Sequence, residues 1–600
     1  MAASRRGQAD LHVRPPSSHA VVALPDLPAI SALFLIGFDV KAGYTILWKA
    51  SKPGVELEGV VEYKSLPSGL HTVSEDLIYF VHDEYAGLSA FINIPVDDTA
   101  ARNACMLAVG VLVPLSYGRL GRAWKHADSL KAIASKLAVD SKDVCALEDY
   151  WEKNQARDPT GDEIAAKDDH ESPDATAQKS KSKDHTKIRP PSDGAAWMLP
   201  GHRLSPFHPA WSLTKLLDTF GPLIFPIHRA ALLRKRILIS GHAPVEEACN
   251  FVYNISVLSN IPLATSDLLL SSSASHRLRP LFSIGVHDIP FLATGARRPR
   301  NTDTASDDQM EASAGWIACT TDSILSNKDT LWDVLITMPP AHASNAKRHT
   351  WPTVELPHKV PLRATQRDMR RFRSLKAGLA RMEGDTGIAS PSTSQTGMVY
   401  TEADMLLDDA EQLVEPTSWT ALAYSGFMWW ASAGEKPRSD EAEEAVQDAL
   451  LLSDPSSSSN AMAMPRTTDI SASLSSLTPR RLSASTPLDL EEAHVELAII
   501  SYFHRLTTQL LGALADAIDS TDGSDADDES PSEEDEALID ADQDIQGHGV
   551  RIDSDVVKSM GLDVWSLSDA EFVTEFLQTY FDRQAFVEGK GIELCGVRVC

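Results

Sequence analysis

The first part of the chain alternates short apolar runs with polar turns, a pattern typical of paired β-strands. The runs at residues 33–38 and 44–48 are joined by a short turn that predicts a hairpin. Further strands are predicted at 77–81, 88–92 and 106–113, and helices at 55–64, 120–137 and 141–153. The order β-β-α-β-β-β-α-α predicts an α+β module with an antiparallel sheet over residues 30–152.

The pattern changes after residue 198. Short apolar runs predict buried strands that alternate with segments of helical spacing, which is typical of a parallel or mixed sheet. The predicted strands are 236–240, 281–286, 316–319 and 331–338, and the predicted helices are 211–220, 222–234, 245–258 and 322–326. Residues 198–382 are therefore expected to form an α/β module.

Polar stretches rich in Pro, Ser and Asp divide the chain, and we expect them to be disordered. They are residues 1–29, 153–197, most of 383–490 and an acidic run at 516–548, with a shorter break at 293–313. Three apolar islands remain: a Trp-rich helix at 418–432, a helix at 491–515, and residues 551–600, which we expect to pack on the body. Residues 421–433 are too few to cross a bilayer and predict a buried helix.

The net charge of −29 is concentrated in one region. Residues 383–550 hold 34 acidic and 6 basic residues, whereas the remainder holds 50 acidic and 49 basic residues. The body is therefore nearly neutral, which argues against a nucleic-acid-binding protein. Six scattered cysteines, no signal-peptide pattern and no apolar run fit to span a membrane predict a soluble, cytoplasmic protein that is not secreted.

Enzyme signatures are absent from the sequence. It contains no GxxxxGK[ST] phosphate loop, no HExxH, no GxSxG and no GxGxxG after a strand. The turn at residues 239–245 has one glycine and no lysine, so a tight strand-to-helix connection explains it better than anion binding. The sequence predicts no catalytic residues, no cofactor and no metal.

Long strings of residues carry a family resemblance. They are ALFLIGFDVKAGYTILWK, GVVEYKSLPSGLH, DLIYFVHDE, VGVLVPLSYGRLGRAW, FPIHRAALLRKRILISG, GWIACTTDSIL and LWDVLITMP. They resemble the fungal branch of the LCHN family, which is related to the Avl-nine group of DENN-like trafficking proteins. SWTALAYSGFMWWASAG, VELAIISYFHRLTTQLL and GLDVWSLSDAEFVTEFL resemble the fungal domain that accompanies that core. The resemblance implies a DENN-like, two-lobe body: a longin-like module followed by an α/β module.

The same resemblance implies a function in membrane trafficking. A DENN-like protein is expected to bind a small GTPase of the Rab type and to act as its guanine-nucleotide exchange factor, by favouring the nucleotide-free conformation rather than by bond chemistry. The alternative is a non-catalytic adaptor or scaffold on an endomembrane or a lipid droplet. Both roles place the protein in the cytoplasm or peripherally on such a membrane.

One basic amphipathic segment is a candidate binding site. In residues 362–382 the apolar side chains, including Phe372, Leu375 and Leu379, fall on one helix face of about 140°. Four arginines are expected on the opposite face: Arg363, Arg367, Arg370 and Arg381. Such a helix can bind an anionic membrane or a partner, although a helix packed at the edge of a domain has the same pattern.

Three smaller features suggest contacts or regulation. Basic clusters at residues 119–125 and 229–236 could dock an acidic partner, although solvated helix ends explain them as well. Ser483, Ser524 and Ser532 lie in sequences that suit phosphorylation. Cys595 is expected in a last strand at 592–599, while acylation of Cys595 or Cys600 stays open.

Overall fold

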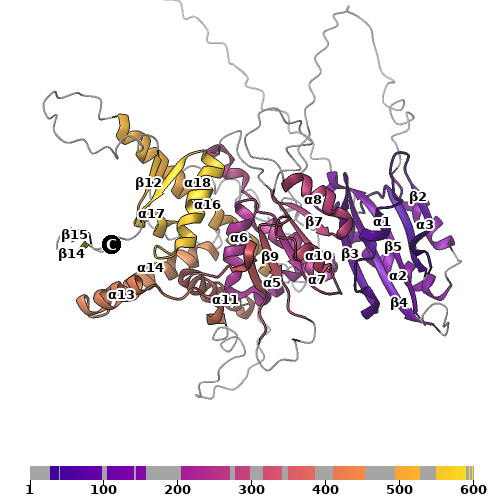
Figure 1. Cartoon of the computed structure of the whole chain (residues 1–600), viewed down its shortest axis with the longest axis horizontal. Coiled ribbons are helices and arrows are strands. Elements are labelled where there is room, and N and C mark those ends of the chain that lie inside the picture. The colour runs from indigo at the N-terminus through magenta and orange to yellow at the C-terminus, as the bar shows by residue number, and fades with distance from the viewer. Residues whose placement is uncertain are drawn as a thin grey trace, which may run out of the picture.

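A computed structural model describes residues 27–39, 41–96, 104–140, 144–156, 205–269, 277–296, 315–340, 343, 349–385, 410–452, 494–526, 549–588, 593–594 and 597–598. The described part is elongated, and the order along the chain follows its long axis. The first module lies at one end, the second module in the middle and the C-terminal helices at the other end (Figure 1).

Five strands form the antiparallel sheet of the first module, in the spatial order β3-β4-β5-β1-β2. They are β1 (Ala32–Asp39), β2 (Gly43–Ser51), β3 (Glu75–His82), β4 (Tyr85–Pro95) and β5 (Ala104–Pro114). The sheet interior is tightly packed at Gly110 of β5, where an added Cβ would come within 2.3 Å of the Phe34 ring. This position therefore requires glycine.

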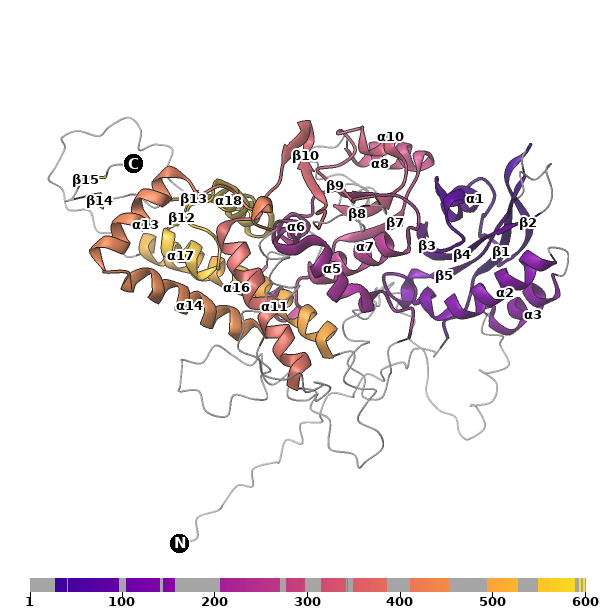
Figure 2. The same ribbon diagram turned by 90° about the horizontal axis from the view of Figure 1, so that it is seen from below.

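Helices cover both faces of this sheet. Helices α2 (Ala127–Val139) and α3 (Cys145–Asn154) lie on one face and α1 (Val61–Ser65) on the other (Figure 2). The helix expected at residues 55–64 is wrong in extent, because only its end is helical. Gly54 and Gly59 have φ angles of 88° and 77° and place turns in the expected first half.

The second module is built around parallel strands. Strands β7 (Arg279–Ser283), β8 (Trp316–Thr320), β6 (Ile237–Ser240) and β9 (Val334–Thr337) are adjacent in that order, and β10 (Thr353–Leu356) and β11 (Val360–Pro361) extend the edge with antiparallel pairing. Helices α5 (Leu213–Phe220), α6 (Ile224–Leu232) and α7 (Glu246–Leu258) lie on one side, and α8 (Ile289–Ala296) and α10 (Ser323–Ser326) on the other (Figure 2). The predicted succession of an antiparallel and an α/β module is confirmed.

The two modules share one eleven-stranded sheet, which the sequence did not predict. Strands β3 and β7 meet through a single antiparallel residue pair, Phe80 with Phe282. A second link comes from Asp76 of β3, whose carboxylate accepts hydrogen bonds from the backbone N–H groups of Val245 (2.7 Å) and Glu246 (3.1 Å) at the start of α7. A side chain of the first module thus caps a helix of the second.

The C-terminal part is mainly helical. Its elements are α11 (Gln366–Asp385), α13 (Trp419–Ala431), α14 (Glu435–Leu452), α16 (His494–Ala526), α17 (Ser554–Ser559) and α18 (Leu567–Phe581), with the parallel pair β12 (Gly549–Ile552) and β13 (Gln584–Val587) and the antiparallel pair β14 (Glu593–Leu594) and β15 (Val597–Arg598). The described residues also form short 3₁₀ turns: η1 (Leu70–Thr72), η3 (Leu115–Tyr117), η4 (Ala123–His126), η5 (Pro209–Ser212), η6 (Gly221–Leu223), η7 (Leu263–Leu268), η8 (Val286–Asp288), η10 (Pro357–Lys359) and η11 (Ala410–Leu413).

Helix α16 joins the C-terminal part to the second module. Its first half buries Tyr502 and Phe503 in the main core, and its second half packs in a smaller core that includes Leu232 of α6. In that smaller core, the Tyr580 hydroxyl of α18 donates a 2.6 Å hydrogen bond to the Leu232 carbonyl. The C-terminal helices therefore share hydrophobic cores with the second module.

Three elements differ from the expectations at this end of the chain. Helix α14 lies in a stretch that was expected to be disordered, and α16 runs beyond residue 515 to Ala526. The single strand expected at 592–599 is replaced by the short pair β14 and β15, while Cys595 and Cys600 lie outside the described residues.

Candidate functional site

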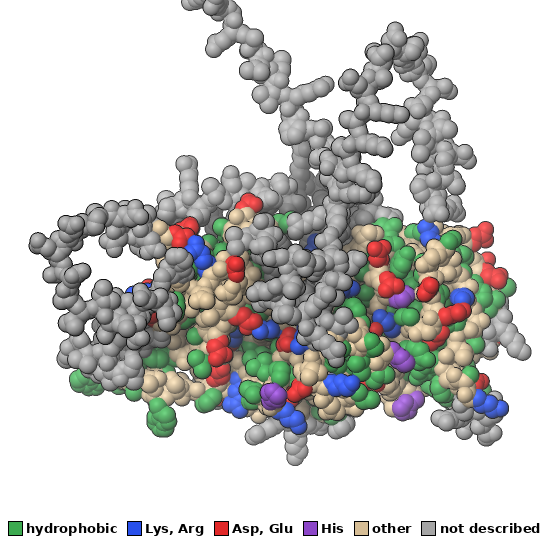
Figure 3. All heavy atoms as spheres, turned by 45° about the horizontal axis from the view of Figure 1, so that its top comes forward, with side chains coloured by type: hydrophobic (Ala, Val, Ile, Leu, Met, Phe, Trp, Pro, Cys, Tyr) green, Lys and Arg blue, Asp and Glu red, His purple; other side chains and the backbone are tan. Residues whose placement is uncertain are grey.

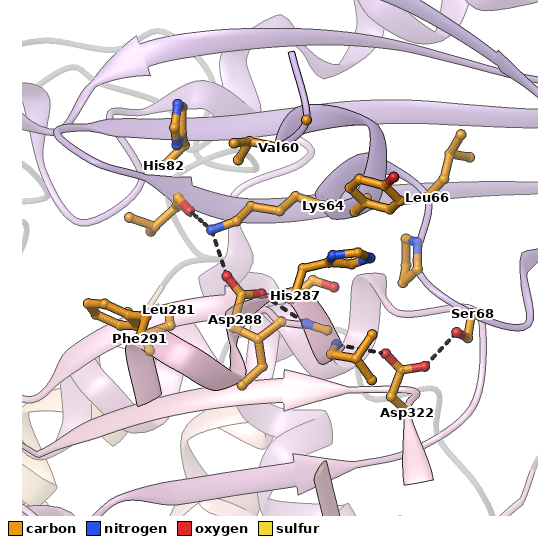
Figure 4. A pocket seen from close by; sticks show the side chains of 18 of the residues that line it. Val60, Lys64, Leu66, Ser68, His82, Leu281, His287, Asp288, Phe291 and Asp322 are labelled. Carbon is orange, nitrogen blue, oxygen red and sulfur yellow. Dashed lines mark hydrogen bonds and ion pairs between the residues drawn. The ribbon is translucent and has the colours of Figure 1, made fainter. Parts of the chain in front are cut away.

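A pocket of about 570 Å³ lies where the two modules meet. The first module contributes α1, the loop after it and the end of β3, and the second contributes β7, η8, the start of α8 and Asp322 (Figure 4). Its size falls within the range of small-molecule and peptide-binding pockets. Because its walls come from both modules, any change in the angle between the modules would change its shape.

Few contacts cross the pocket. The rings of Tyr63 and His287 stack with centroids 3.8 Å apart and planes at 27°. The Lys64 ammonium lies 3.1 Å from the Asp288 carboxylate and donates a 2.6 Å hydrogen bond to the Val81 carbonyl (Figure 4). The Ser68 hydroxyl donates a hydrogen bond to the Asp322 carboxylate. Three contacts therefore join α1 and the loop after it to the second module: the Tyr63–His287 stack, the Lys64–Asp288 ion pair and this hydrogen bond.

Backbone N–H groups in the pocket wall hold two of its carboxylates in place. The Asp288 carboxylate accepts a hydrogen bond from Gly285 N–H at 3.0 Å, and the Asp322 carboxylate accepts one from Val286 N–H at 3.2 Å. Both carboxylates are therefore fixed before any ligand arrives. Burial raises the pKa of Tyr44 on the pocket wall, and the nearby Asp322 raises it further, so its hydroxyl stays protonated.

The rim of the pocket is aromatic and partly exposed. Tyr63 and Phe291 are each a little under half exposed, and the Arg279 guanidinium lies 5.7 Å from the Phe291 ring centroid. Within the described residues, no group of three or more His, Cys, Asp and Glu side chains is placed to hold a metal ion. The arrangement suits the docking of a partner's surface, with aromatic contacts at the rim and paired charges in the wall.

Helix α11 is the basic segment that the sequence singled out, and the structure packs it against the body. Phe372, Leu375 and Leu379 are buried in the main core, and Arg363 and Arg381 are exposed. The expected position of Arg367 on the exposed face is wrong: Arg367 is buried and donates two hydrogen bonds to Asp448 of α14, at 2.9 and 2.8 Å. Arg370 pairs with Glu444 of α14 at 2.8 Å.

Buried charges link α11 to its neighbours on both sides. Arg371 lies 3.2 Å from the same Asp448 carboxylate, and Asp368 accepts two hydrogen bonds from Arg229 of α6 at 2.8 and 2.7 Å. Burial alone would lower the pKa of Arg229, but Asp368 and Asp569 outweigh it and raise that pKa. Burial raises the pKa of Asp569 to about 7 against the opposing effect of Arg229, which lies 3.2 Å away.

Hydrogen bonds and ion pairs within the chain also involve most of the arginines and lysines of the other two basic clusters. Arg119 and Arg234 are buried and donate to backbone carbonyls of Ser256 and Ser259, respectively, at the end of α7. Lys235 pairs with Glu575 of α18, and Arg236 lies 2.7 Å from Asp333. The interpretation of these residues as solvated helix ends or docking patches is therefore corrected, since most of them bind segments of the same chain.

Helix α13 is not buried, contrary to the sequence prediction. Trp419 is 85% exposed and Trp430 is 76% exposed, and Leu422, Phe427 and Trp429 are also exposed. Trp565 does pack against the body side of this helix, with its ring 5.2 Å from that of Tyr424. No sequence signal distinguished the outward face, because both faces of α13 are apolar.

The remaining predicted sites are only partly described. Ser524 lies in the last turn of α16, whereas Ser483 and Ser532 lie outside the described residues. Conversely, sequence reasoning missed the pocket between the modules, because its residues come from two distant segments, residues 44–83 and 279–322, and form no motif.

Comparison with known proteins identifies the family. The family model "DENN domain-containing protein 11" matches residues 33–348, which is more than half of the chain. The chain belongs to this family. A second model, "Domain of unknown function (DUF4484)", matches residues 414–600, the part that contains α13 to α18.

Individual relatives agree with this assignment to the DENN domain-containing protein 11 family. The chain is 29% identical to DENN domain-containing protein 11 of Xenopus laevis over 51% of this chain and 59% of the relative, and 30% identical to that of Danio rerio over 51% and 53%. It thus spans little more than half the length of these curated relatives. It is also 22% identical to "Uncharacterized protein ANR2" of Saccharomyces cerevisiae over 93% of this chain and 92% of the relative.

Proposed function

We propose that this protein binds a Rab-type small GTPase over the mouth of the pocket between its two modules and acts as a guanine-nucleotide exchange factor. DENN-domain proteins are, as a class, regulators of Rab-type GTPases, and family membership supports the same role here. The observation that carries the proposal is the pocket itself, which is lined by both modules and rimmed by the half-exposed rings of Tyr63 and Phe291.

The proposed mechanism requires no acid–base chemistry. The modules meet through one strand pair, the Asp76 cap, the hydrogen bond from Arg119 to Ser256, a shared hydrophobic core and the three contacts across the pocket, so both pocket walls are held in a defined relative position. A GTPase held by both walls would be stabilised in the conformation that fits the pocket. If this conformation binds nucleotide weakly, binding accelerates nucleotide release.

The test is the release of a fluorescent guanine nucleotide from a panel of purified Rab proteins. We expect the full chain to accelerate release from at least one Rab, and we expect the double variant Tyr63→Ala/Phe291→Ala to reduce that acceleration at least about tenfold. The matched control is Val139→Ser on α2, which removes an exposed apolar side chain away from the pocket. Equal activity of the pocket variant and the control would refute the assigned site.

The same assay separates the exchange factor from an adaptor. Stable binding of a Rab without faster release would support the adaptor role, and absence of binding to every Rab would refute both.

Two finer assignments are also proposals. The LCHN and Avl-nine branch is supported by the resemblance of the sequence strings between residues 32 and 339. Peripheral association with an endomembrane or a lipid droplet is consistent with the trafficking role of the class.

Binding of α11 to an anionic membrane would require a rearrangement, whereas docking of a partner at the pocket would not. Its apolar face lies in the core and two of its four candidate arginines pair with α14, so the helix would have to leave the body before it entered lipid.

A further inference from the structure

Helix α13 presents an apolar surface that its neighbours in the chain leave uncovered. Ala421, Tyr424 and Met428 fall on the side that faces the body, and each of them is buried or half-buried. At 100° per residue, the five exposed apolar residues fall on an arc of about 160° centred on the opposite side. These residues, here called the α13 face, are Trp419, Leu422, Phe427, Trp429 and Trp430. The larger apolar side chains therefore point outward and the smaller ones inward.

The α13 face is large and prominently placed. With roughly 150–250 Å² per aromatic side chain, it exposes on the order of 600 Å² of apolar surface, which is at the upper end of the largest patches found on ordinary monomers. Figures 1 and 2 both place α13 at the end of the molecule opposite the first module. Hydrophobic side chains stand out at this end in the space-filling view (Figure 3).

Charge distinguishes between the surfaces that could cover this face. Residues 416–434 contain no charged side chain, whereas α14, which follows directly, has six acidic and two basic residues. Glu435 and Glu441 of α14 are exposed beside the helix. A protein interface normally surrounds its apolar centre with a polar, hydrogen-bonding rim, whereas the exposed polar side chains of α13 itself are Thr420 and Ser425 alone. The exposed charges at the start of α14 are of both signs, since Lys436 and Arg438 lie beside the carboxylates, and therefore offer anionic lipid no net attraction.

The length of α13 limits how it could contact a membrane. Thirteen residues make a helix of about 20 Å, shorter than the hydrocarbon core of a bilayer. Across the described ranges, no helix is both long enough and apolar enough to cross a membrane. A short, convex, uncharged helix rich in tryptophan suits the boundary between lipid headgroups and acyl chains, where the indole ring is in an apolar environment while its N–H stays hydrated.

We propose that the α13 face inserts into the surface of a lipid layer with neutral headgroups, and so docks this end of the molecule on a membrane. The proposal does not depend on GTPase binding, because α13 and the pocket lie at different places along the molecule. It predicts that insertion depends on gaps in lipid packing rather than on lipid charge. Binding should therefore be stronger to small, highly curved vesicles than to large ones and insensitive to salt.

The test is flotation of the full chain with phosphatidylcholine vesicles. We expect the wild-type protein to float, and we expect Trp419→Ser/Trp430→Ser to weaken binding at least about tenfold. The control is Leu47→Ser/Val139→Ser, which removes two exposed apolar side chains from the first module and should bind like wild type. Unchanged thermal unfolding would show that both double variants are folded, since all four side chains are exposed.

A second measurement needs no variant. Brominated phosphatidylcholine should quench part of the tryptophan fluorescence of the wild-type protein if indole rings reach the acyl region. Three results would overturn the proposal: no flotation of the wild type, equal flotation of the tryptophan variant, or binding that requires phosphatidylserine. A wild-type dimer that Trp419→Ser/Trp430→Ser dissociates would instead assign the α13 face to a second copy of the chain.

Discussion

At the scale of single residues, the most consequential group is Asp448 on α14. Its carboxylate accepts hydrogen bonds from Arg367 and Arg371, and all three side chains are almost fully buried. Two guanidinium groups thus depend on one carboxylate. Because a buried charge without a partner is far less stable than a solvated one, the fold requires the helix that supplies this carboxylate.

Replacing Asp448 should therefore be costly. We expect Asp448→Ala to lower the free energy of unfolding by about 3–5 kcal/mol, because it removes the carboxylate paired with the buried Arg371 and leaves the buried Arg367 with the more distant Glu444, at 3.5 Å. The control is Asp440→Ala on the same helix, whose ion pairs with Lys436 and Lys558 are partly exposed and should contribute less than about 1 kcal/mol. Urea unfolding followed by tryptophan fluorescence measures both. Equal losses for the two variants would contradict a special role for the buried network.

At the scale of elements, the apolar pattern predicted the strands well and the ion-paired helices poorly. Strands β1, β3, β4, β5, β6, β8 and β9 bury continuous apolar runs, so the runs locate them directly. Helix α14 was missed because it is mostly polar and is held by arginines that lie about 80 positions earlier in the sequence. The orientation of α13 was missed because both its faces are apolar. The pocket could not be predicted, since it depends on how β3 meets β7.

The link between β3 and α7 should give the stability a distinctive pH dependence. Burial raises the pKa of Asp76 to about 6, although hydrogen bonds from Val245 and Glu246 oppose the shift. The unfolded value is about 3.9, so between these two pH values the folded state binds more protons than the unfolded state. Ionisation of Asp76 should therefore reduce stability as pH rises from about 4 to about 6.

The variant Asp76→Asn isolates the titration, because its amide does not ionise. Its one oxygen can accept one of the two N–H groups that bond the two carboxylate oxygens, and the loss of the other bond adds a cost that does not depend on pH. We expect the melting temperature of wild type, relative to that of Asp76→Asn, to fall as pH rises over this interval. Asp76→Ala should in addition be destabilised by about 1–2 kcal/mol at all pH values, since it removes the cap of α7. A constant difference between wild type and Asp76→Asn would show that Asp76 does not titrate in this range.

At the scale of the whole molecule, the C-terminal region is a structural part of the body. The match to DUF4484 begins at residue 414, yet α16 contributes Tyr502 and Phe503 to the main core and α14 supplies the partner of two α11 arginines. The sequence suggested separate islands because long polar stretches interrupt the region. In the structure the islands are brought together by contacts with α6, α7 and α11 rather than by their own sequence proximity.

The chain should therefore survive a break between α14 and α16. We expect a protein with a protease site inserted between residues 452 and 494 to remain a single species in gel filtration after complete cleavage, at micromolar concentration. The physical reason is that the smaller fragment shares two hydrophobic cores with the rest of the chain. Phe503 of α16 lies in the main core, α18 packs with Leu232 in the smaller core, and Tyr580 donates a hydrogen bond to the Leu232 carbonyl. Adding Leu510→Asp, which places a charge in the smaller core, should release the fragment after cleavage. The control Ser520→Asp, at an exposed position of the same helix, should not. Dissociation of the cleaved wild-type chain would instead mean that the C-terminal region is held mainly by the covalent connection.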